Sequence, residues 1–85
     1  MANSKQMDLI VTDRSAGVVF TGSVRGVSAY NAKGLFDVLP IHSNFITVLR
    51  KKLILHKTDG SKQEMNIQNG VMRVLLGKVE VYLGV

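Results

Sequence analysis

Few side chains in this 85-residue sequence could take part in catalysis or hold a metal ion. His42 and Asp37 are the only histidine and carboxylate close together in the sequence, and Ser43 is the nearest hydroxyl. A hydrolytic triad needs a nucleophile bonded to its base and an oxyanion hole, and the residues around Ser43 do not resemble a nucleophile elbow. His42 and His56 lack the spacing of paired ligands, and the chain has no cysteine to complete a zinc site. We therefore expect no catalytic residue and no metal site.

A phosphate-binding loop is also missing from the sequence. Gly22 and Gly26 are four residues apart, but no Lys-Ser or Lys-Thr pair follows them and no helix is expected to begin there. We therefore expect no nucleotide and no other cofactor.

The charge of the chain is consistent with an anionic partner. Eleven Lys and Arg against six Asp and Glu give a net charge of +5, which suits nucleic acid, anionic lipid or an acidic protein. The only run of basic residues, Arg50, Lys51 and Lys52, is typical of a solvated turn. The hydrophobic fraction of 46% indicates a folded domain, and no apolar run is long enough to cross a bilayer.

Single-stranded nucleic acid is the alternative partner, because small basic β-barrels stack bases on exposed aromatic side chains. Phe20, Phe36 and Phe45 suit core positions better than exposed ones. Tyr30 and Tyr82 are then the only candidate stacking platforms, and neither lies in a cluster of aromatic and basic residues.

The hydrophobic pattern predicts an all-β chain. Apolar residues alternate with polar ones in short segments, and no window of 12 residues has a helical period. Turns are expected at Asp13–Gly17, Asn31–Gly34, Asp59-Gly60, Asn69-Gly70 and Gly77-Lys78. We expect about eight to ten short strands, which at this length make a small β-sandwich or flattened barrel.

The chain should turn a corner after the strand that Gly34 begins. Gly34 can adopt a positive φ, and Pro40 removes a backbone donor and so should end that strand. A new strand should start at Phe45, after a corner at residues 41–44. His42 lies in this corner, either satisfying backbone groups there or contacting a partner.

This corner resembles a known segment. Gly34, Val38, Leu39, Pro40 and His42 are similar to the Gly-x-x-x-Val-Leu-Pro-x-His segment of the ε subunit of F-type ATP synthases, in its N-terminal β-sandwich domain. The resemblance also takes in the opening strands, where Phe20-Thr21-Gly22 is similar to a Phe-Ser-Gly-like step, and the closing Val79-Glu80-Val81 strand. We expect residues 1–6 to be a flexible N-terminus and residues 7–85 to form an ε-type β-sandwich domain.

The resemblance implies a non-catalytic central-stalk subunit. In that family the sandwich packs against the γ subunit, and its membrane-side loops rest on the c-ring, so the domain couples proton-driven rotation to ATP synthesis. It implies no bound nucleic acid, a monomer when isolated, and a peripheral position on the cytoplasmic, inner face of the energy-transducing membrane. The family's inhibitory C-terminal helices are not seen here, either naturally or because the sequence is a shortened piece, so we expect coupling without that inhibition.

Carried over position by position, the c-ring side would be formed by the following residues: Tyr30, Lys33, Leu35, Ile41 and His42. The sequence departs from the family pattern there. Leu35 takes a place that is commonly acidic, and Ile41 replaces a frequent Gly. These changes make the contact at Leu35 apolar, unless its strand face turns inward, with Lys33 meeting an acidic or carbonyl-rich loop.

Overall fold

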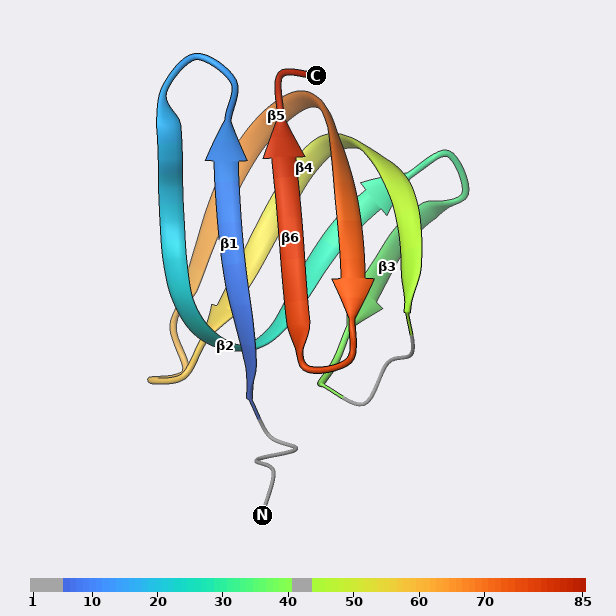
Figure 1. The fold of residues 1–85 in the computed structure, drawn as a ribbon. Helices are drawn as coiled ribbons and strands as arrows, with labels where there is room; N and C mark the ends of the chain where they lie inside the picture. The colour runs from blue at the N-terminus through green and yellow to red at the C-terminus, as the bar shows by residue number, and fades with distance from the viewer. Residues whose placement is uncertain (1–5, 41–43) are drawn as a thin grey trace.

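A computed structural model describes residues 6–40 and 44–85, and it is made of strands. There are six in this part of the chain: β1 (Met7–Asp13), β2 (Gly17–Asn31), β3 (Gly34–Val38), β4 (Phe45–Lys57), β5 (Lys62–Leu75) and β6 (Lys78–Leu83). The predicted all-β fold is thus confirmed (Figure 1). Among these residues no helix is long and apolar enough to cross a membrane.

The strands form one sheet that closes on itself. Their order is β1-β6-β5-β4-β2-β3, and an additional pairing of β1 with β2 joins the sheet into a flattened barrel (Figure 1). β1 and β6 run parallel, whereas the other neighbours are antiparallel. β3 lies outside the closed ring of strands, because it pairs only with β2.

Six long strands replace the eight to ten short ones predicted, because bulges let a strand bend without ending. In β2 the first half pairs with β1, and the second half pairs with β3 and β4. The change of partner falls at a register shift between Val24 and Gly26, where Arg25 is the extra residue. A bulge adds one residue to one strand and increases the local twist, so β2 can serve both sides of the barrel.

Two further predictions were wrong for the same reason. The basic run Arg50–Lys52 is not a turn, since it lies inside β4 at a register shift between Arg50 and Lys51. Lys51 has a φ of 69°, in the left-handed region that bulges often use. Asn69 and Gly70 are likewise not a turn, because they continue β5 and pair with Arg50 and Leu49.

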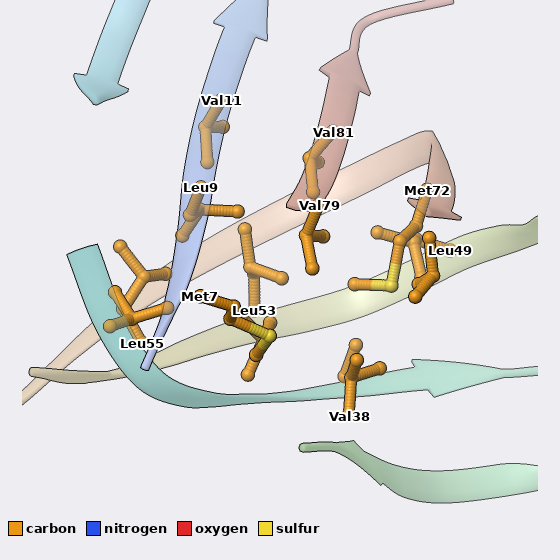
Figure 2. Close-up of a cluster of buried hydrophobic side chains, with 14 of the residues drawn as sticks. Met7, Leu9, Val11, Val38, Leu49, Leu53, Leu55, Met72, Val79 and Val81 are labelled. Carbon is orange, nitrogen blue, oxygen red and sulfur yellow. The ribbon is translucent and has the colours of Figure 1, made fainter. Parts of the chain in front are cut away.

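The core lies between the two sides of the barrel and follows the alternation of the sequence. Met7, Leu9 and Val11 of β1 are buried, with polar or partly exposed residues between them. Figure 2 shows these side chains pointing toward Leu53 of β4 and Val79 of β6. Three aromatic side chains pack against the edge of this core as expected: Phe20, Phe36 and Phe45. The result is a stiff, closed body with side chains from every strand in its interior.

Candidate functional site

The structure brings together three of the five residues predicted to form the c-ring side. Tyr30 of β2 and Leu35 of β3 are directly opposite each other in the sheet, and Lys33 lies in the turn between these strands. Asn31 holds this turn, because its side-chain oxygen accepts a 2.9 Å hydrogen bond from the backbone N–H of Lys33. Leu35 is 59% exposed, so its strand face points outward and not into the core. Ile41 and His42 lie outside the described residues.

A hollow lies beside this hairpin because two strands separate. β2 and β4 pair only as far as Tyr30 and Arg50, and beyond that point their contact is a 3.2 Å bond from Asn31 Nδ2 to Thr47 Oγ1. The hollow has a volume of about 480 Å³, and its lining includes Lys33 and Arg50 but no carboxylate. Within the described chain neither of these two cations belongs to a salt bridge.

The neighbouring cations differ from one another in their contacts. Lys51 Nζ lies 5.8 Å from the centroid of the Tyr30 ring, a cation–π distance. Lys52 Nζ lies 3.2 Å from Glu64 Oε1, so its charge is paired. No Asp or Glu occurs at residues 14–36, 38–58 or 65–79. The hairpin end of the barrel is therefore positively charged, and an approaching anionic or carbonyl-rich group meets no carboxylate from these segments.

A second candidate surface runs across the outer face of five strands. In the register of the sheet five residues follow one another from β4 to β2: Val48, Val71, Tyr82, Thr12 and Val18. We call these five residues the apolar row. Val48 is 67% exposed and Val18 is 57% exposed. Ile46, two residues before Val48 on the same face, is also 67% exposed, so the row is part of a wider apolar surface.

A third group of polar side chains joins β2, β3 and β4. Ser28 Oγ donates a 2.5 Å hydrogen bond to Asp37 Oδ1 and lies 2.7 Å from His56 Nε2. The residue types are those of a hydrolytic triad, but the arrangement differs: a triad places the imidazole between the hydroxyl and the carboxylate, whereas here the hydroxyl is in the middle. Ser28 is only 6% exposed and has no room for a substrate. This group is a structural bridge.

The sequence analysis missed this bridge because it paired Asp37 with the nearest histidine, His42. The hairpin itself carried a usable signal. With Asn31 opposite Gly34, counting back along both strands places Ser28 opposite Asp37, as observed. The approach of His56 could not be found in this way, because the bulges between β2 and β4 change the register. Among the described residues there is no group of three or more His, Cys, Asp or Glu that could hold a metal ion.

The comparisons with known proteins agree with this fold. Residues 6–83 match the model of a protein family described as the ATP synthase Delta/Epsilon chain, beta-sandwich domain. The chain belongs to this family. The resemblance read from the corner sequence is thus confirmed at the level of the family.

Two curated relatives show how much of a full subunit the chain covers. The ATP synthase epsilon chain of Helicobacter pylori (strain Shi470) is 35% identical over 65 residues, which are 76% of this chain and 53% of the relative. The ATP synthase epsilon chain of Sulfurovum sp. (strain NBC37-1) is 34% identical over 59 residues, or 68% of this chain and 46% of the relative. The chain thus spans about half the length of the curated relatives it matches.

Solved structures share the fold of this family member. A chain in the Euglena gracilis mitochondrial ATP synthase, in a structure of OSCP, F1 and c-ring in rotational state 1, superposes with a TM-score of 0.87 at 20% identity. That match covers 98% of this chain and 53% of the other. A chain in the central stalk and c-ring of the Tetrahymena thermophila mitochondrial ATP synthase gives 0.71 at 9% identity, covering 96% and 66%. At these identities the likeness is one of fold.

Proposed function

We propose that this chain is the ε-type subunit of a rotary F-type ATP synthase, where it lies in the central stalk between the γ subunit and the c-ring. It couples proton-driven rotation to ATP synthesis as a rigid spacer and carries out no chemistry itself. Family membership supports the assignment to the complex. The observation that carries the two-sided role is the presence of two exposed surfaces of different chemistry, the apolar row and the basic hairpin end.

The γ side of the proposal rests on the apolar row. A run of exposed apolar side chains across five paired strands is more than the scattered surface hydrophobics of an ordinary monomer, and continuous apolar patches mark sites of protein association. The strands beneath it belong to the closed barrel, so the surface is held flat and rigid. Subunits that stay together during rotation need such packed, largely apolar contact.

The c-ring side of the proposal rests on the β2–β3 hairpin. Leu35 and Tyr30 offer a small apolar contact, and Lys33 and Arg50 beside them offer donors to the acidic or carbonyl-rich ends of polar loops. Ile41 and His42 stay in this proposed patch on the strength of the family pattern alone. The position implied is a peripheral one on the cytoplasmic side of the energy-transducing membrane.

A role without catalysis is part of the proposal. Ser28, the hydroxyl that approaches both a histidine and a carboxylate, is buried and lacks the geometry of a nucleophile. The 85 residues act through sheet and hairpin surfaces, and we propose that they couple rotation without the inhibition that helices give in this family. Nucleic-acid binding has less support, because Tyr30 is half-buried beneath Lys51 and Tyr82 lies within the apolar row.

The γ contact can be tested with one charge. Val48→Asp places a carboxylate in the middle of the apolar row, and Lys62→Asp places one at an exposed position of β5 away from that row. Binding of each variant to purified γ subunit, measured by calorimetry, should fall at least tenfold for Val48→Asp and stay within about twofold for Lys62→Asp, since burying an unpaired charge is costly. Equal binding by both variants would refute this γ surface.

A further inference from the structure

β3 is held to the barrel on one side only. It has five residues, it pairs with β2 through five register positions, and its other edge has no strand beside it in the described chain. Val38 is the only residue of β3 that is fully buried, although the Phe36 ring also packs edge-on against Phe45 at 6.4 Å between centroids. Short edge strands with little buried surface open locally at low free-energy cost.

The bridge described above crosses this weak point. Ser28 lies opposite Asp37 in the β2–β3 register, and His56 comes from β4 on the far side of β2. The two hydrogen bonds at Ser28 therefore connect three neighbouring strands in a line, from the edge strand to the interior of the sheet. Ser28 sits on the outer face of β2, whereas its neighbours Val27 and Ala29 belong to the core.

The donors and acceptors of the bridge follow from its geometry. A serine hydroxyl has one proton, which Ser28 donates to Asp37 Oδ1. The contact between Ser28 Oγ and His56 Nε2 must then be donated by the imidazole, so Nε2 carries a proton. Both neighbours of the buried hydroxyl are thus satisfied, and a hydrogen bond to a carboxylate is among the stronger ones.

A glycine gives the imidazole room to reach the serine. Gly26 lies opposite His56 in the register, and a Cβ at Gly26 would be 3.2 Å from the carbonyl oxygen of Val38 and 3.3 Å from Leu39 Cδ2. His56 Cδ2 would be 3.9 Å from that same Cβ. A residue with a side chain at position 26 would therefore press on the end of β3 and crowd the ring.

We propose that Ser28, Asp37 and His56 form a fastener that fixes the edge strand β3 to β2 and β4 and so positions Leu35 and Lys33 for docking. The docking part rests on the function proposed above, since β3 and its turn carry the proposed c-ring contacts. The fastening part does not depend on it. These are positioning residues, because none of them needs to touch the partner.

Native-state hydrogen exchange of the 85-residue chain, followed by NMR, tests the fastening part. Ser28→Ala removes both hydrogen bonds, and the amides of β3 should then exchange about tenfold faster while those of β1 and β6 change less than twofold. Ser23→Ala is the matched control, because Ser23 is an exposed serine of the same strand with no side-chain bond in the described chain. No selective increase at β3, or an equal increase in all strands, would overturn the proposal.

A second pair of variants keeps the test usable if Ser28→Ala folds poorly. Asp37 is exposed, so both of its replacements should fold. Asp37→Ala should speed exchange in β3 as Ser28→Ala does. Asp37→Asn keeps an oxygen that can accept the serine proton, and β3 protection should largely return. Equal exchange by the Ala and Asn variants would contradict the fastener.

Binding to isolated c-ring and to γ separates the two parts of the proposal. Ser28→Ala should weaken c-ring binding at least fivefold and leave γ binding within twofold of the original. Faster exchange in β3 with unchanged c-ring affinity would refute the positioning role. If the original chain binds no c-ring at all, the proposed function fails at that surface and the positioning role with it, whereas the exchange data alone decide the fastening.

Discussion

Gly70 of β5 lies so close to Tyr82 of β6 that no other residue fits there. A Cβ at Gly70 would be 2.8 Å from the carbonyl oxygen of Tyr82 and 2.9 Å from Leu83 Cδ2, although the position is buried between paired strands. The first of these neighbours is backbone in a parallel and antiparallel ladder and cannot move aside cheaply. Gly70 is therefore a packing requirement of the barrel and not a turn residue.

Gly70→Ala should destabilise the domain by about 2 to 3 kcal/mol, the range of an overpacked core, and lower its melting temperature by roughly 8 to 20 °C for a chain of this size. Gly77→Ala is the comparison, because Gly77 has open space around it but a φ of 77°. Its cost should be nearer 1 kcal/mol, which is the conformational term alone. Thermal unfolding followed by circular dichroism measures both, and equal losses would contradict the packing explanation.

Leu53 should be among the most sensitive core positions. Its side chain is fully buried between the two sides of the barrel, so Leu53→Ala should cost about 2 to 4 kcal/mol in unfolding free energy. Ile46→Ala removes a similar number of carbon atoms from a side chain that is 67% exposed and should cost less than 1 kcal/mol. Urea unfolding of the two variants tests this, and a comparable loss for Ile46→Ala would mean that its face is covered in the isolated chain.

Asp59 gives a pH-dependent signal in the β4–β5 turn. The hydroxyl of Ser61 donates a 2.6 Å hydrogen bond to Asp59 Oδ1, and this bond holds the pKa of Asp59 below its ordinary value of 3.8, with help from the Ser61 backbone N–H. The pKa is lowered in the folded state, so the stabilisation is complete above the unfolded-state pKa and is lost as the pH falls through the folded one.

Ser61→Ala should move the pKa of Asp59 back up toward 3.8, because it removes the largest cause of the shift. An NMR titration of the carboxyl carbon measures this directly, and Asp8, on β1, serves as the reference carboxyl in the same sample. An unchanged Asp59 titration would show that the backbone bond alone sets its value.

The sequence predicted the class of fold and most of its turns because those depend on local chemistry. The Asp59-Gly60 and Gly77-Lys78 hairpins form as expected, and Gly34 has a positive φ of 116°. Chain continuity was predicted less well. The segments on either side of Asn69-Gly70 look like two strands joined by a tight turn, but the tertiary pairing with β4 and β6 carries one strand through.

The candidate surfaces needed the structure because they depend on register across several strands. The apolar row joins Val18 to Val48 through three intervening strands, and no sequence spacing relates these two residues. The carried-over residues Tyr30 and Leu35 belong to one hairpin, so their pairing followed from its turn. The partner of Asp37 was misjudged because sequence proximity favoured His42 over a serine on the adjacent strand.

The central claim is that this domain couples rotation only by being bound on two sides. Its most direct test is proton pumping driven by ATP, measured in vesicles that contain an F-type ATP synthase stripped of its own ε subunit. Adding this chain should restore pumping without lowering the rate of ATP hydrolysis, and Val48→Asp should fail to restore it. Pumping that stays absent with the unmodified chain, or hydrolysis that falls when it binds, would contradict the account.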